Sequence, residues 1–249
     1  MNDKIKISAS SIQTLEQCPR KWFLRYIRKL YPEVGEKDAT EFGSFVHDVA
    51  EHYNGDGLEQ MTKIAKEALG KYKFNRDYKN KVKTAIKNLY IFYTKRFKNG
   101  ELEKEQKYEC HYRDNFFLTG KLDVLYFEEE GKVYILDWKT SKAEKDHSFQ
   151  LAFYVFLLNF MKRINLKTVD CEVVYLCPDK NDMELYVSPY TIDQDDVKSA
   201  VARFENLITQ YKCLGVEDIE KWRKKTGPLC NWCDYYKSGD CTGKEPCHG

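Results

Sequence analysis

The chain has 249 residues, 42% of them hydrophobic, which is enough for one large core. Its 41 Lys and Arg nearly balance its 39 Asp and Glu, so the net charge of +2 excludes a general polycation. No run of about 18 apolar residues occurs and no secretory leader begins the chain, so we expect a cytoplasmic protein without membrane contact.

Helical patterns fill roughly the first hundred residues. Ser10 and Gln13 are interpreted as a capping box, and apolar residues follow at helical spacing until Cys18-Pro19, where a turn precedes a second short helix. Further helices are predicted over residues 42–53, 58–72 and 78–98.

Positive charge is concentrated in one part of this helical region. Residues 61–104 contain thirteen Lys or Arg against four Asp or Glu, so the segment carries +9 and the remainder of the chain −7. Five aromatic residues are interleaved with it: Tyr72, Phe74, Tyr78, Tyr90 and Tyr93. This composition suits a nucleic-acid backbone and stacked bases, but a solvated lysine-rich helix face would look the same.

Strand patterns dominate the next part of the chain. Strands are predicted over 107–113, 116–127, 132–139, 169–177 and 183–190, with an apolar helix over 147–164 and a last helix over 193–213. The strand–helix–strand order indicates a crossover between parallel strands. We expect one α/β domain over residues 1–249, with a mixed central sheet flanked by helices. Its parts are a basic helical segment at about 54–104, a sheet core at about 105–190 and a cysteine-bearing tail at about 226–249.

Four motifs occur in order: Gly43-Ser-Phe-Val-His47, Gly120-Lys-Leu-Asp123, Asp137-Trp-Lys139-Thr140 and Gln150-Leu-Ala-Phe-Tyr154. If the loop Glu129-Glu130-Gly131 joins the second and third strands, Asp123 lies opposite Asp137, with Lys139 on the same face. Facing carboxylates repel each other unless a cation lies between them, and carboxylates suit Mg²⁺ or Mn²⁺.

These residues therefore predict a divalent metal site held by Asp123 and Asp137, with His47 completing the shell. Lys139 would assist hydrolysis of a phosphodiester beside the metal. An ordinary Asp–Lys ion pair on a hairpin is the plain alternative for any one motif taken alone.

The order of the four motifs resembles the RecB-like branch of the PD-(D/E)XK nuclease superfamily. It looks especially like the small iron–sulfur nucleases associated with CRISPR adaptation and the AddB-type nuclease domain. The resemblance spans Ser10 to Cys241 and implies a restriction-endonuclease-like fold. It implies the following roles: His47, Asp123 and Asp137 as metal ligands, Lys139 as the catalytic lysine, and Gln150 with Tyr154 as a DNA-facing pair. Leu122 stands where the superfamily nominally has proline.

Nine cysteines, an odd number, favour reduced thiols over a disulfide framework. Three late ones are spaced Cys230-x2-Cys233-x7-Cys241, and Cys18 could supply a fourth thiolate. Thiolates accept iron–sulfur or tetrahedral zinc, and the spacing does not decide between them. The resemblance implies a [4Fe–4S] cluster on these four, with Cys247 as another candidate for the last ligand. Its expected role is structural, and free thiols are the alternative.

The function expected from these features is that of a Mg²⁺- or Mn²⁺-dependent deoxyribonuclease, acting as an exonuclease on single-stranded DNA or free ends. Repair or recombination, phage DNA processing and CRISPR adaptation are the contexts considered, with a helicase, recombination or integrase protein as partner. Two alternatives stay open at this point. One is a DNA-end-binding module without turnover that carries an iron–sulfur or zinc site, and the other is a zinc protein whose hairpin is incidental.

Overall fold

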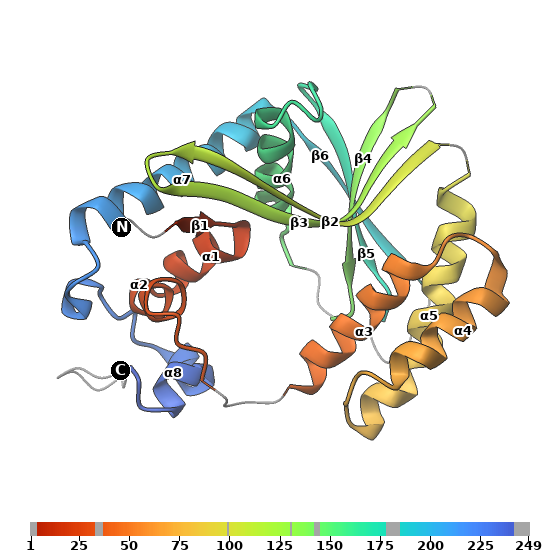
Figure 1. Ribbon diagram of the computed structural model, residues 1–249, viewed down its shortest axis with the longest axis horizontal. Helices are drawn as coiled ribbons and strands as arrows, with labels where there is room; N and C mark the ends of the chain where they lie inside the picture. The colour runs from red at the N-terminus through yellow and green to blue at the C-terminus, as the bar shows by residue number, and fades with distance from the viewer. Residues whose placement is uncertain are drawn as a thin grey trace.

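The computed structural model describes residues 4–32, 37–98, 100–129, 131–141, 145–177 and 185–241. Its centre is a sheet in the order β1-β3-β4-β5-β6, with β2 also paired to β3 (Figure 1). The strands are β1 (Ile5–Ile7), β2 (Gly100–Arg113), β3 (Phe116–Glu128), β4 (Val133–Lys139), β5 (Val169–Tyr175) and β6 (Tyr186–Ile192). Parallel pairs (β1 with β3, β4 with β5) and antiparallel pairs coexist, so the expected mixed α/β fold is confirmed.

Helices cover both faces of the sheet. On one face lie α1 (Ala9–Gln17), α6 (Ser148–Phe160) and α7 (Gln194–Leu214), packed on a core that includes Leu125 and Ile135. On the other lie α3 (Asp38–His52), α4 (Gly57–Leu69) and α5 (Arg76–Arg96), packed on Val124 and Leu136. Adjacent strand residues thus serve opposite cores, as the alternation of side chains along a strand requires.

The β3–β4 hairpin has the predicted register. Val124 pairs with Leu136 and Phe127 with Val133. Gly131, the last residue of the predicted loop, has a φ of 79°, a left-handed conformation that glycine adopts without strain, while Glu130 lies outside the described residues. Asp123 and Asp137 therefore lie one step beyond the last pair of this ladder.

The aromatic residues of the basic segment pack on the core, and for the buried Phe74 and Tyr93 the interpretation as base-stacking groups is wrong. Phe74 and Tyr93 are buried, and Tyr72, Tyr78 and Tyr90 pack against the same cluster. Lysines such as Lys63, Lys79, Lys83 and Lys87 remain on the exposed side of α4 and α5. A single amphipathic pattern accounts for both features, with rings inward and cations outward.

The start of α1 also differs from the prediction. The helix begins at Ala9, and its N-cap is Ser8, whose side chain accepts a hydrogen bond from the Ser11 N–H. The Ser11 hydroxyl in turn accepts from the Ser8 N–H, so the capping box is formed by Ser8 and Ser11 rather than by Ser10 and Gln13. Ser10 and Gln13 are consequently left available on the helix surface.

The beginning and the end of the described chain pack against each other. After α2 (Pro19–Trp22) and a π-helical turn (Phe23–Ile27), Trp22 stacks on Trp222 with ring centroids 5.0 Å apart. The Tyr235 hydroxyl, from α8 (Asp234–Lys237), donates to the Leu30 carbonyl over 2.7 Å. Two short 3-10 turns, Ile219–Lys221 and Pro228–Trp232, connect α7 to α8.

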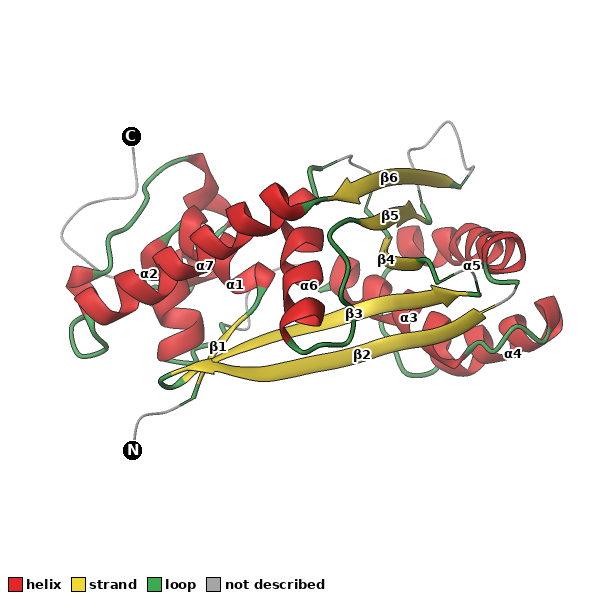
Figure 2. Ribbon diagram, turned by 90° about the horizontal axis from the view of Figure 1, so that it is seen from above, coloured by secondary structure: helices red, strands yellow, loops and turns green. Residues whose placement is uncertain are grey.

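Figure 2 shows β2 and β3 as a long hairpin that runs from the α1 side of the molecule to the α3–α5 side. Within the described ranges, no helix is long and apolar enough to cross a membrane.

Candidate active site

The motif residues meet at the ends of β3 and β4. Asp123 comes from β3, Asp137 and Lys139 from β4, His47 from α3, and Gln150 with Tyr154 from α6. Glycines lie where these elements approach one another. A Cβ on Gly120 would lie 3.0 Å from Leu157 Cδ2 and 3.1 Å from the Tyr154 ring, closer than ordinary contacts, so glycine favours the close packing of α6 on β3. A Cβ on Gly43 would lie 3.6 Å from Thr140 Oγ1, so α3 also approaches the end of β4.

Asp123 is buried and is anchored to the neighbouring strand. Its Oδ2 accepts a hydrogen bond from the Trp138 N–H over 2.7 Å. Its Oδ1 lies 3.3 Å from His47 Nδ1. One carboxylate therefore connects β3, β4 and α3.

Asp137 and Lys139 project from the same face of β4, as predicted. Lys139 Nζ lies 2.5 Å from Asp137 Oδ2. The other Asp137 oxygen, Oδ1, accepts from Gln150 Nε2 over 2.9 Å, and the same amide donates to the Tyr154 hydroxyl over 3.0 Å. The Gln150–Tyr154 pair thus contacts Asp137.

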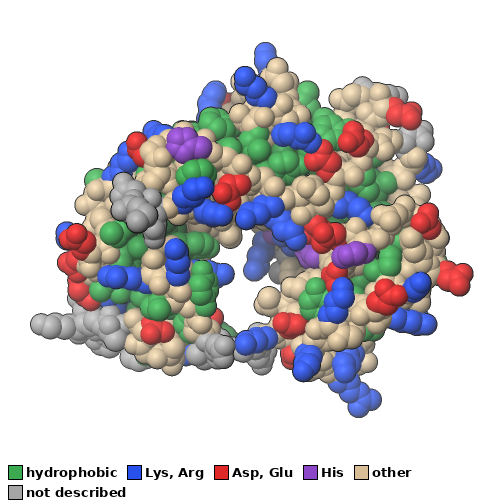
Figure 3. Space-filling view, viewed as in Figure 1, with side chains coloured by type: hydrophobic (Ala, Val, Ile, Leu, Met, Phe, Trp, Pro, Cys, Tyr) green, Lys and Arg blue, Asp and Glu red, His purple; other side chains and the backbone are tan. Residues whose placement is uncertain are grey.

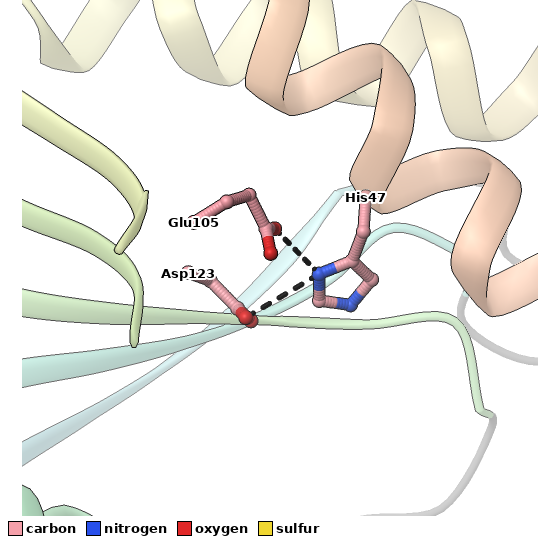
Figure 4. Close-up of side chains that lie close together, drawn as sticks. All are labelled: His47, Glu105 and Asp123. Carbon is pink, nitrogen blue, oxygen red and sulfur yellow. Dashed lines mark hydrogen bonds and ion pairs between the residues drawn. The ribbon is translucent and has the colours of Figure 1, made fainter. Parts of the chain in front are cut away.

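A third carboxylate, Glu105, lies beside His47 and Asp123 (Figure 4). Its Oε1 is 2.7 Å from His47 Nδ1, and its Oε2 is 2.6 Å from Lys121 Nζ. One potential ligand atom from each of His47, Glu105 and Asp123 can be chosen so that all three lie within 4.8 Å of one another. These three residues are called the trio below, and Asp137 lies next to it.

Glu105 was missed from the sequence because its backbone is unusual. The β2–β3 ladder pairs Lys104 with Val124 and Gln106 with Leu122, and skips Glu105, whose φ is 51°. A non-glycine residue in the left-handed region is uncommon and strained, and at Glu105 this conformation takes the residue out of the ladder. The predicted strand began at 107, too late to include it. Glu109, a carboxylate on the predicted strand, pairs instead with Lys6 at 2.7 Å.

The electrostatics of the site reflect an excess of buried carboxylate. Burial lowers the pKa of His47, but Asp123 and Glu105 outweigh this and raise the pKa to about 10. Burial is the main cause that raises the pKa of Asp137 to about 6. The neighbouring Asp123 also raises this pKa, whereas Lys139 lowers it. Burial also works to lower the pKa of Lys139, yet Asp137 and Asp123 hold that pKa above its usual value. His47 and Lys139 are thus cations at neutral pH.

The trio fits a divalent metal ion. Carboxylate oxygens are hard donors that Mg²⁺ and Mn²⁺ accept, and an imidazole nitrogen completes such a set once its proton is lost. A cavity of about 500 Å³ opens beside the trio and is also lined by Ser44 and Lys121. It offers room for water and for a further ligand beside the ion.

The four predicted cysteines line one separate cavity. Cys18, Cys230, Cys233 and Cys241 surround a space of about 280 Å³ between the α1–α2 turn and the carboxyl-terminal turns. Chain segments more than 200 residues apart thus present thiols to one space. Cys247 lies outside the described residues. Of the other cysteines, Cys171 and Cys177 are buried, whereas Cys213 is exposed.

Comparisons with known proteins agree with this geometry. A family model described as the PD-(D/E)XK nuclease superfamily matches residues 6–238. No curated protein matches the sequence. An exonuclease candidate from Eubacterium rectale has a similar fold, with a TM-score of 0.61 and 12% identity, over 98% of this chain and 90% of that one.

Two further solved structures are less similar. SSO0001 has a TM-score of 0.44 and 15% identity, over 97% of this chain and 87% of that one. LHK-Exo in complex with dAMP has a TM-score of 0.37 and 10% identity, over 71% of this chain and 91% of that one.

The raised pKa of Asp137 predicts that Asp137→Asn stabilises the metal-free protein. The folded-state pKa of about 6 exceeds the reference value of 3.8, so stability falls as the pH rises through this window, and the ionised carboxylate is destabilising at pH 8. Neutral Asn should raise the unfolding free energy by about 1–3 kcal/mol. For a chain of this size each kcal/mol raises Tm by about 2–4 °C.

Thermal unfolding in EDTA at pH 8 measures this difference, which should shrink as the pH falls from 6 toward 4, because the folded-state carboxyl becomes protonated over this range. A lower Tm for Asp137→Asn at pH 8 would contradict the electrostatic account.

Proposed function

We propose that this chain, which belongs to the PD-(D/E)XK nuclease superfamily, is a Mg²⁺- or Mn²⁺-dependent deoxyribonuclease that hydrolyses phosphodiester bonds. The observation that carries the proposal is the convergence of the trio with Asp137 and Lys139 at the edge of a cavity. A buried cluster of three carboxylates is costly, and a cation-dependent reaction on a polyanion gives it a purpose.

His47, Glu105 and Asp123 would hold the ion, with Asp137 as the adjacent carboxylate able to join them. A bound Mg²⁺ or Mn²⁺ would act as a Lewis acid on the scissile phosphate and neutralise part of its charge. The backbone of β4 orients Asp123 through the Trp138 N–H, so this ligand is fixed before an ion arrives.

Lys139 is the proposed catalytic lysine. Asp137 keeps it protonated and holds Nζ at 2.5 Å, so it can donate a hydrogen bond to the attacking water or to an oxygen of the phosphate as negative charge develops there. Gln150 fixes Asp137 from the opposite side, and Tyr154 fixes Gln150. In this proposal Gln150 and Tyr154 also face the DNA.

Single-stranded DNA with a free end is the proposed substrate, degraded as by an exonuclease. Figure 3 shows a gap between two parts of the molecule, with Lys and Arg side chains gathered along its upper rim. Cations along this gap suit the backbone of a single DNA strand. The order of the four motifs supports placement in the RecB-like branch, with repair, phage or CRISPR-associated partners such as a helicase or an integrase.

A [4Fe–4S] cluster is proposed for Cys18, Cys230, Cys233 and Cys241. Their common cavity supports a shared ligand. Thiolates accept either an iron–sulfur cluster or zinc, and the resemblance favours the cluster. A cluster held by these four residues would join the two ends of the chain.

A DNA-binding module without turnover is less well supported, because the trio, Asp137 and Lys139 are all present and in contact. An inactive derivative would have no need to keep these buried charges together.

Cleavage of end-labelled single-stranded DNA in Mg²⁺ or Mn²⁺ tests the proposed activity. Asp123→Asn, Glu105→Gln and Lys139→Ala should each lower kcat by about a hundredfold or more, because each removes a ligand or a charge that acts on the transition state. Glu109→Gln is the matched control, since this carboxylate on the same strand pairs with Lys6 outside the trio. Undiminished cleavage by Asp123→Asn and Lys139→Ala would refute the proposal.

Anaerobic purification with iron, sulfide and zinc analysis tests the cysteine site. We expect about four iron and four sulfide per chain, with the iron content reduced in Cys233→Ser and unchanged in Cys213→Ser, whose thiol is exposed elsewhere. A colourless protein with one zinc per chain would replace the cluster with a zinc site.

A further inference from the structure

A notch interrupts the pairing along one edge of strand β3, beside the trio. Along this edge β3 pairs first with β1, at Phe116 to Leu118, and then with β4, from Val124 onward. In the described ladders the intervening residues 119–122 pair only with β2, on the opposite edge. The notch is therefore bounded by the end of β1 on one side and by the end of β4, with Asp137, on the other.

A cavity of about 400 Å³ occupies this notch. Ser10 and Gln13 of α1 line one side, Gln150 and Tyr154 of α6 line another, and Lys107 and Lys121 line the strands. None of its lining residues is acidic, so every full charge at the cavity is positive.

The two lysines are direct cross-strand partners: Lys107 of β2 pairs with Lys121 of β3. Like charges at facing positions destabilise an antiparallel pair, so this placement costs stability unless an anion lies near both. Each lysine forms an ion pair within the chain, Lys107 with Glu109 at 3.7 Å and Lys121 with Glu105 at 2.6 Å. Both side chains remain more than half exposed, so both ammonium groups are accessible to a ligand.

Lys121 connects the notch to the candidate metal site. It lines this cavity and also the cavity beside the trio, and it contacts the trio member Glu105. Gln150 provides a second connection, because it lines the notch and donates to Asp137. An anion in the notch would thus be a near neighbour of the phosphate that is cleaved.

We propose that the notch binds a backbone phosphate of the DNA strand that flanks the scissile phosphate, with Lys107 and Lys121 as the cationic contacts. This subsite rests on the proposed nuclease function and specifies how that site receives its substrate. Lys107 is a binding residue in this arrangement, because its contacts lie outside the trio. The hydroxyl of Ser10 and the amide of Gln13 supply neutral donors around the same phosphate oxygens.

The test is a double-mutant cycle between Lys107 and single phosphates of the substrate. Fluorescence anisotropy in EDTA measures binding of single-stranded oligonucleotides that each carry one uncharged methylphosphonate linkage. At one linkage, the methylphosphonate should weaken binding to the wild type by about threefold to tenfold and weaken binding to Lys107→Ala by less, because that variant keeps only Lys121 as a cationic contact. Lys198→Ala is the matched control, because Lys198 is an exposed lysine with one carboxylate partner, Asp195, on the distant helix α7.

The position of the coupled linkage completes the test. In Mg²⁺ or Mn²⁺, the linkage that the wild type cleaves should lie next to the coupled one. The proposal would be overturned if the methylphosphonate had equal effects on the wild type and Lys107→Ala at every linkage. It would also be overturned if the coupled linkage were remote from the cleaved one. Binding in EDTA does not depend on cleavage, so the two proposals can fail separately. If Lys107 and one linkage are coupled in binding but no metal supports cleavage, the proposed nuclease function and the flanking role are rejected. The notch would then remain a phosphate-binding site.

Discussion

The balance of charge around Asp123 is the constraint on which the rest of the site depends. Three carboxylates, Glu105, Asp123 and Asp137, are matched by three cations, His47, Lys121 and Lys139. Loss of the His47 proton and release of Lys121 from Glu105 would remove two positive charges, which a divalent ion would restore. The same exchange would free Lys121 for a substrate phosphate. Ion binding and substrate binding are therefore coupled in this account through shared side chains.

The fold positions these charges by close approach of its elements. Gly120 lets α6 reach β3, so Gln150 meets Asp137, and the Trp138 N–H fixes Asp123 from the adjacent strand. The large aromatic cluster beneath α3, α4 and α5 holds the helix that carries His47. A site built in this way needs little rearrangement of its backbone to accept an ion, because the strands already hold the carboxylates close to one another.

Features that depend on local pattern were predictable from the sequence. The Gly131 turn determines the hairpin register, and the register places Asp137 and Lys139 on one face. Features that depend on tertiary context were not. Glu105 reaches the site because its backbone has a positive φ, and glutamate has no preference for that conformation that a sequence could reveal. Phe74 and Tyr93 belong to the core, although their spacing among lysines resembled a nucleic-acid-binding surface. The capping box was misplaced by two residues because several serines adjoin the start of α1.

The central claim is that His47, Glu105 and Asp123 bind one divalent cation. Calorimetric titration with Mn²⁺ at pH 8, in two buffers of different ionisation enthalpy, tests it most directly, because the His47 pKa of about 10 requires a proton to leave as the ion binds. We predict release of about one proton per Mn²⁺ in the wild type, with affinity at least tenfold weaker in Glu105→Gln and unchanged in Glu109→Gln. Binding of equal strength in all three proteins, without proton release, would contradict it.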